Sequence, residues 1–188
     1  MSTRPATTAA RPESCAERVW DPLVRVFHWS LVALFFANVL VLDDEGAAHR
    51  WVGYAVLGLV AIRVVWGFVG TRPARFSAFP PSLGAARRHL SAMLSGRPER
   101  HPSHNPLGAL MVYNLLATMV AIGVSGWLMT TNAFWGVEWV EEVHETLADW
   151  ALISVGLHVA GVLFEQWRSH VPLVRAMITG VRENPPQP

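Results

Sequence analysis

Four long apolar stretches constrain the fold of this 188-residue chain more than any other feature. They cover residues 23–42, 51–70, 107–129 and 147–164. A helix needs about 20 predominantly apolar residues to cross the hydrocarbon core of a bilayer. The helices of a soluble bundle would carry a polar face, and these stretches carry almost none. The sequence therefore predicts an all-α fold, an integral membrane four-helix bundle.

The composition agrees with a membrane protein and argues against nucleic-acid binding. Hydrophobic residues make up 52% of the chain and charged residues only 15%, whereas a soluble domain carries about 25% charged residues. The net charge of +1 gives no electrostatic reason to bind nucleic acid. The first twenty residues are polar and lack a compact apolar segment, so we expect no cleaved signal peptide. We expect one domain over residues 20–180, flanked by disordered ends at 1–19 and 181–188.

Local signals mark where two of the helices begin. Asp21-Pro22 and Asn105-Pro106 each place a capping side chain before a proline at the first helical position. Residues 82–94 have a different pattern, with two arginines beside an apolar face. This segment predicts a short amphipathic helix on the inner leaflet, and a solvated linker helix is the alternative. Its apolar face consists of Leu83, Ala86, Leu90, Met93 and Leu94.

Arginine residues are distributed unevenly among the segments that connect the four stretches. By the positive-inside rule, segments rich in arginine face the cytoplasm. Only Arg50 lies in a connection on the opposite side, so we expect both termini in the cytoplasm. The arginines on that side are Arg4, Arg11, Arg18, Arg25, Arg72, Arg75, Arg87, Arg88, Arg97, Arg100, Arg168, Arg175 and Arg182.

Four histidines fall within the apolar stretches or at their ends. His28 lies near the cytoplasmic end of the first stretch, and His49 lies at the outer end of the second. His144 lies just before the fourth stretch, and His158 lies fourteen residues further inward. At 1.5 Å per residue these two are about 21 Å apart on one face of a continuous helix. Depth therefore pairs His28 with His158 near the cytoplasmic side, and His49 with His144 near the outer side.

Two imidazoles that face each other from different helices are the arrangement that a bis-histidine b haem requires. Two pairs predict two haem b groups, with these histidines as axial ligands of the iron. A buried histidine is often only a hydrogen-bonded structural residue, and His28 and His49 could also be interfacial anchors. Zinc is disfavoured because the ligands fall into two layers, and a proton relay is a further alternative. Covalent haem attachment is excluded because the chain has no CxxCH motif.

Arg63 is the one charged residue deep within a predicted span. It lies at the depth of the cytoplasmic-side histidine pair, where a haem propionate or a quinone could neutralise it. The alternative is that its side chain extends to the cytoplasmic headgroups. We interpret the other histidines as solvated or interfacial, with His104 as a candidate contact for a quinone on the inner side. These are His89, His101, His104 and His170.

Four separated motifs resemble the bacterial cytochrome b561 family, which groups with the cytochrome b subunits of nickel–iron hydrogenases. They are "WDPLVRVFHWSL", "HRWVGYAVLGLVAIRVVWGFVG", "HNPLGALMV" and "HETLADWALISVGLHVAGV". They occur in order over about residues 20–180, with their histidines in register. The resemblance implies a four-helix membrane bundle with two b haems, held by His28 with His158 and by His49 with His144. The chain has four spans, whereas the hydrogenase subunits typically have a fifth.

The resemblance further implies a multi-pass inner-membrane protein of the respiratory chain. It would transfer electrons between a quinone pool, ubiquinone or menaquinone, and a redox partner. Iron with both axial positions filled transfers electrons and does not activate oxygen, so we expect no catalytic residue. A periplasmic c-type cytochrome is one candidate partner, and an oligomer is compatible with the sequence. The alternatives are a stand-alone superoxide:quinone oxidoreductase, the cytochrome b subunit of a hydrogenase or dehydrogenase complex, and a transporter or scaffold without redox activity.

Overall fold

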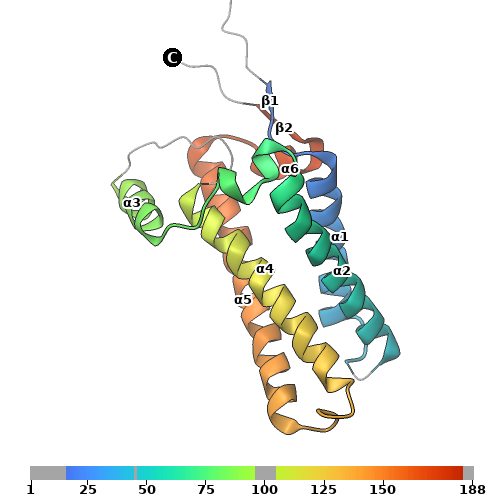
Figure 1. Cartoon of the computed structure of the whole chain (residues 1–188). Helices are drawn as coiled ribbons and strands as arrows, with labels where there is room; N and C mark the ends of the chain where they lie inside the picture. The colour runs from blue at the N-terminus through green and yellow to red at the C-terminus, as the bar shows by residue number, and fades with distance from the viewer. Residues whose placement is uncertain (1–15, 45, 96–104, 184–188) are drawn as a thin grey trace, which may run out of the picture.

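Four long helices form the body of the protein, as Figure 1 shows. The computed structural model describes residues 16–44, 46–95 and 105–183. Within this part of the chain the long helices are α1 (Pro22–Leu40), α2 (Ala47–Val69), α4 (Pro106–Met129) and α5 (Glu138–Ser169). All four are long and apolar enough to cross a membrane. The prediction of an all-α fold with four candidate spans is confirmed.

The two predicted helix starts are confirmed in detail. The Asp21 carboxylate accepts a hydrogen bond from the amide of Val24 at 2.9 Å, and Pro22 is the first residue of α1. The Asn105 side chain accepts one from the amide of Gly108 at 2.7 Å, directly before Pro106. Each cap satisfies one of the amides that the first turn of a helix leaves without a partner.

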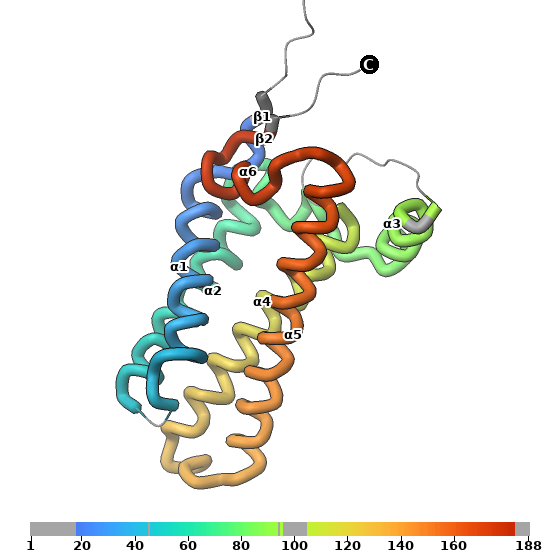
Figure 2. The backbone as a smooth tube through the Cα atoms, turned by 180° about the vertical axis from the view of Figure 1, so that it is seen from behind, coloured from blue at the N-terminus to red at the C-terminus, as the bar shows by residue number. Residues whose placement is uncertain are grey.

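The long helices pack in the order α1, α2, α4, α5, with each contacting the next. Hydrogen bonds between side chains reinforce the contact of α4 with α5: Asn114 donates to the Ser154 hydroxyl at 2.9 Å and accepts from the Trp150 indole at 3.2 Å. In Figure 2 the ribbons of α1 and α2 lie on one side, and those of α4 and α5 lie on the other. The histidines that the sequence pairs come from these two sides.

The outer surface of the bundle is apolar. At most 22% of the apolar window of any of the four helices is buried inside the protein. Leu40, Ile62, Phe68 and Leu157 are each more than half exposed. Apolar surface of this extent is expected where lipid covers the protein. Exposed tryptophans near the helix ends, such as Trp51, Trp139 and Trp167, are also typical of the two membrane interfaces.

Nearly all other ordered elements lie at one end of the bundle, which we call the loop-rich end (Figure 1). They are the strands β1 (Ala16–Arg18) and β2 (Val181–Glu183), the 3-10 helices η1 (Arg72–Ala74) and η2 (Phe76–Ala78), and the helices α3 (Leu83–Leu94) and α6 (Leu173–Thr179). Of the described residues, only those of the α1–α2 and α4–α5 connections lie at the opposite end, which we call the short-loop end. This asymmetry matches the distribution of arginine along the chain.

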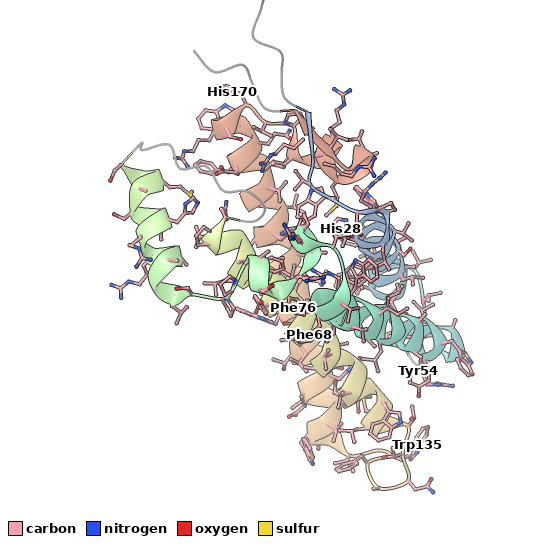
Figure 3. The ribbon with its side chains drawn as sticks, turned by 45° about the horizontal axis from the view of Figure 1, so that its top comes forward. His28, Tyr54, Phe68, Phe76, Trp135 and His170 are labelled. Atoms are coloured by element: carbon pink, nitrogen blue, oxygen red, sulfur yellow. The ribbon has the colours of Figure 1, made fainter. Side chains whose placement is uncertain are left out.

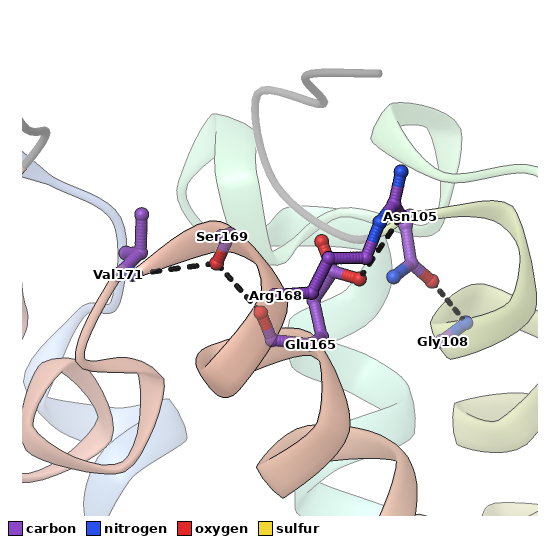
Figure 4. A network of polar contacts seen from close by, with 6 residues as sticks. All are labelled: Asn105, Gly108, Glu165, Arg168, Ser169 and Val171. Atoms are coloured by element: carbon purple, nitrogen blue, oxygen red, sulfur yellow. Dashed lines mark hydrogen bonds and ion pairs between the residues drawn. The ribbon is translucent and has the colours of Figure 1, made fainter. Parts of the chain in front are cut away.

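The end of α5 is closed by local polar contacts, shown in Figure 4. The Ser169 hydroxyl donates to the carbonyl of Glu165 at 2.7 Å and accepts from the amide of Val171 at 3.3 Å. His170 follows with a φ of 55° and reverses the chain direction. The Arg168 guanidinium lies 3.7 Å from the Glu165 carboxylate on the same helix. These contacts lead the chain into α6, across the loop-rich end.

The structure differs from the sequence predictions near the termini. Strands β1 and β2 pair antiparallel, with Arg18 opposite Val181, so the predicted disorder at 1–19 and 181–188 does not extend to them. Backbone pairing fixes these segments although few of their side chains are apolar. The remaining terminal residues, 1–15 and 184–188, lie outside the described residues. Helix α5 also begins at Glu138, nine residues before the predicted span, because an acidic first turn is favourable at a helix N-terminus.

Helix α3 confirms the predicted short helix and corrects the interpretation of His89. The helix packs against α4 and buries Ala86 and His89, which is only 1% exposed. The solvated or interfacial position expected for His89 is therefore wrong. Leu83 and Leu90, expected on the same face as Ala86, are exposed instead. Small Ala86 allows the close approach that places the imidazole one turn away at the interface.

Candidate haem-binding site

His49 and His144 face each other at the short-loop end of the bundle. Their ring centroids are 6.2 Å apart, with an angle of 67° between the ring planes. His49 lies in the first turn of α2, and His144 lies in the second turn of α5. Two imidazoles on opposite sides of one metal ion, each bound at about 2 Å, would have their ring centres about 6 Å apart. The pair expected from depth is thus brought together at a separation that suits a shared ion.

His28 on α1 and His158 on α5 both lie nearer the loop-rich end. The two imidazoles lie within electrostatic range of each other, and both side chains are half-buried. Helix α5 is continuous from Glu138 to Ser169, so His144 and His158 lie on one helix, about 21 Å apart along its axis. Figure 3 labels His28 towards the end where His170 lies, with Trp135 at the opposite end.

An apolar layer separates the two pairs. Ala151 lies midway between His144 and His158 on α5 and is fully buried. Phe35 follows His28 by seven residues and Val56 follows His49 by seven, so both lie at this middle depth. The buried cluster comprises Phe27, Phe35, Val56, Val60, Met119 and Ala151. Phe35, Val56 and Ala151 therefore place buried apolar side chains at the depth between the two layers of histidine.

The surroundings of the histidines fit a bound haem. The Nδ1 atoms of His28 and His49 are buried and have no hydrogen-bond partner among the described residues. A Cβ added to Gly53, one turn from His49, would meet no atom within 4 Å, which leaves room for a flat ligand. Within the described residues no group of three or more histidine, cysteine or acidic side chains could hold a metal ion. Ligands arranged two by two suit a porphyrin iron, whose other four ligands come from the macrocycle.

Arg63 on α2 is buried near the loop-rich end, with 4% of its surface exposed. Its Nη2 donates to the carbonyl of Ala74 at 3.1 Å, and its guanidinium carbon lies 5.2 Å from the centroid of the Phe76 ring. Its Nη1 is buried without a partner. The guanidinium is therefore covered by the 71–79 loop and not extended into headgroups, and one of its nitrogens remains available to an anionic group.

Gly67 explains how the 71–79 loop covers Arg63. A Cβ at this position would lie 2.2 Å from a carbon of the Phe76 ring, so only glycine allows Phe76 to lie against α2. Phe76 also contacts Tyr113 on α4, with ring centroids 5.4 Å apart. The sequence reasoning missed this loop, although Phe76 and Phe79, three residues apart, were a signal for a structured segment.

The other histidines are placed as follows. His89 is buried at the α3–α4 contact, and His170 is exposed where α5 ends. His101 and His104 lie outside the described residues, so the expected contact of His104 with a quinone remains a prediction. Sequence reasoning also missed Ser125 on α4, whose hydroxyl lies 2.9 Å from Nδ1 of His144. The sequence around a single serine in an apolar helix does not indicate which residue its hydroxyl will contact.

Comparison with known proteins identifies the family. No curated protein and no solved structure matches the chain significantly. The profile of the prokaryotic cytochrome b561 family matches residues 19–180, which include all four long helices and all four paired histidines. The chain therefore belongs to the prokaryotic cytochrome b561 family of membrane-bound, haem b-binding electron-transfer proteins.

Proposed function

We propose that the chain is a di-haem cytochrome b of the bacterial inner membrane. Residues 20–180 form the functional unit, with His28 and His158 as the axial ligands of one haem and His49 and His144 as those of the other. The protein passes electrons across the bilayer between a quinone pool, ubiquinone or menaquinone, and a redox partner. Family membership supports haem b and electron transfer, and the two layers of histidine support the number of haems.

The facing rings of His49 and His144 are the observation that carries this proposal. Each bound b haem would supply a one-electron redox centre. The protein holds the four ligands at two depths on nearly rigid helices, and α5 contributes one ligand to each. The buried layer around Ala151 places apolar side chains at the depth between them. Arg63 supplies a buried positive charge at the depth of the His28–His158 pair, where a propionate would satisfy its free Nη1.

The loop-rich end faces the cytoplasm in this proposal, and both termini lie there. The support is its content of arginine together with the lack of arginine, apart from Arg50, in the two short connections. The His49–His144 pair then lies near the periplasm. Electrons enter or leave the membrane on that side through this pair.

A periplasmic partner with a basic surface, such as a c-type cytochrome, would suit the short-loop end. Glu138, Glu141 and Glu142 are exposed there at the start of α5. Complementary charge accelerates docking and makes it sensitive to salt. Replacing the three glutamates by glutamine should flatten the dependence of electron-transfer rate on ionic strength. An unchanged dependence would remove this partner surface from the proposal.

A potentiometric titration of the purified protein, followed in the visible α band, tests the proposed function. It should resolve two one-electron components with the spectrum of low-spin, bis-histidine b haem. A single component would reduce the proposal to one haem. A colourless preparation from cells supplied with haem precursor would contradict it.

A further inference from the structure

Helix α4 donates no histidine to either pair, yet it contacts the ring of His144 closely. Ser125 is 5% exposed, and its Oγ lies 2.9 Å from Nδ1 of His144 and 3.0 Å from the carbonyl oxygen of Ile122. The His144 ring is therefore held by a polar side chain of α4.

Counting protons assigns the direction of these hydrogen bonds. A serine hydroxyl has one hydrogen, and a carbonyl oxygen can only accept. Ser125 therefore donates to Ile122 and accepts from His144, whose Nδ1 must carry the proton. A neutral imidazole with its proton on Nδ1 has its lone pair on Nε2. This is the tautomer that binds a metal through Nε2.

Gly126 allows the His144 ring to pack closely against α4. A Cβ at this position would lie 3.0 Å from Cε1 and 3.4 Å from Nδ1 of His144, so the imidazole rests directly against the backbone of α4. His49, on the other side of the pair, has no such support, because its Nδ1 is buried without a partner. The two histidines therefore differ: contacts with α4 fix the ring of His144, whereas no hydrogen bond to Nδ1 fixes the ring of His49.

We propose that Ser125 is a positioning residue of the periplasmic-side haem, which selects the tautomer and orientation of His144 while Gly126 provides the space for its ring. The inference rests on the proposed di-haem function. Metal-bound histidines usually donate their second N–H to an acceptor, which fixes the ring and makes it a stronger electron donor to the metal. Removing the Ser125 acceptor should weaken that donation and favour the reduced state of this haem alone.

The test compares Ser125→Ala, Ser125→Thr and Gly126→Ala with two matched controls, all as full-length protein purified in detergent. Ser154→Ala removes another buried serine hydroxyl of the α4–α5 contact, one that bonds Asn114 and no histidine. Gly58→Ala adds a methyl group to α2 on the side opposite His49, where a Cβ meets no atom within 4 Å. The readouts are haem content, the low-spin electron paramagnetic resonance signals of the two haems, and their midpoint potentials.

Ser125→Ala should raise the midpoint potential of one haem, change its resonance signal, and speed its loss to apomyoglobin by roughly tenfold or more. Ser125→Thr should restore these properties, and both controls should resemble the wild type in them. Gly126→Ala should change the same resonance signal although it keeps the Ser125 hydroxyl. If the Ser125→Ala protein is not produced in folded form, the Gly126→Ala variant tests the inference in its place. Two wild-type signals in a haem-loaded Ser125→Ala or Gly126→Ala protein would overturn the inference and leave the proposed function intact. A wild type with no haem would instead refute the proposed function.

Discussion

The imidazole rings of His49 and His144 lie 6.2 Å apart although they belong to helices α2 and α5, which do not follow one another in the chain. Helix α4 lies between these two in the packing order and contacts both. Gly123 and Gly126 on α4 meet Leu57 of α2 and His144 of α5, respectively. Helix α4, which carries no histidine, therefore packs directly between the two helices that carry this pair.

The four histidines should separate into two pairs when they are replaced singly. His28→Ala and His158→Ala should each remove the same haem, and His49→Ala and His144→Ala should each remove the other. About half of the haem should remain in each variant, measured by the pyridine haemochrome assay and assigned by redox titration. The control is His170→Ala, an exposed residue at the end of α5. Loss of both haems in every variant, from protein that is still folded by circular dichroism, would contradict the assignment by depth.

Replacing Arg63 should lower the midpoint potential of the haem held by His28 and His158. The buried positive charge of Arg63 disfavours the oxidised iron, which is the more positive state. Arg63→Gln removes this charge and therefore stabilises the oxidised iron. For a one-electron couple, a shift of about 59 mV in the midpoint potential corresponds to a tenfold change in the equilibrium constant of reduction. Arg63→Lys keeps the charge and should shift the potential less, and Arg87→Gln on the exposed face of α3 should leave it unchanged. If Arg63→Gln shifted only the other haem, the placement of Arg63 beside this one would be wrong.

Asp21 should stabilise the fold in a pH-dependent manner. Burial raises the pKa of its carboxyl, but hydrogen bonds from Thr71, Trp66 and the backbone amides outweigh this and hold the pKa below 3.8. Two of these bonds join the start of α1 to the end of α2, from the Trp66 indole at 3.0 Å and the Thr71 hydroxyl at 2.5 Å. Because the folded pKa is depressed, the stabilisation is complete above 3.8 and is lost as the pH falls through the folded pKa.

Thermal unfolding in detergent checks the role of Asp21. Asp21→Asn preserves a good helix cap but removes the charge, so it should lower the unfolding temperature at neutral pH. The difference from the wild type should shrink as the pH falls below about 4. Asp21→Ala also loses the cap and should cost about 1 kcal/mol more. A difference between wild type and Asp21→Asn that stays constant down to pH 2.5 would show that the charge contributes nothing.

The proposed orientation predicts the outcome of reporter fusions. Alkaline phosphatase, which is active only in the periplasm, should be inactive when fused after residue 188 and active when fused after residue 133, between α4 and α5. Green fluorescent protein should show the opposite pattern at the same two positions. The reverse result would place the His49–His144 pair on the cytoplasmic side, and the proposed orientation in the membrane would then be wrong.

The sequence predicted the architecture because apolar length and helix caps are local properties. The residues 23–42 and 107–129 differ from α1 and α4 by at most two positions at either end, since Asp21-Pro22 and Asn105-Pro106 fix the starts. The pairing of His49 with His144 could also be predicted, because depth along a spanning helix follows from residue number. The early start of α5 was missed because Glu138, Glu141 and Glu142 interrupt the apolar pattern there.

Contacts that depend on tertiary packing were beyond prediction. Nothing local indicates that the Ser125 hydroxyl meets His144, that Phe76 lies against Gly67, or that α3 turns His89 towards the protein. The ribbon of β1 with β2 joins residues more than 160 positions apart, and its short segments lack an alternating apolar pattern. Each of these features needs the helices to be placed first.

The ratio of haem to protein in the purified wild type tests the central claim most directly. Pyridine haemochrome absorbance gives the haem, and quantitative amino-acid analysis gives the chain. The account predicts two b haems per chain, one for each layer of histidines. A ratio that stays at one in fully haem-supplied preparations, or a preparation without haem, would contradict it.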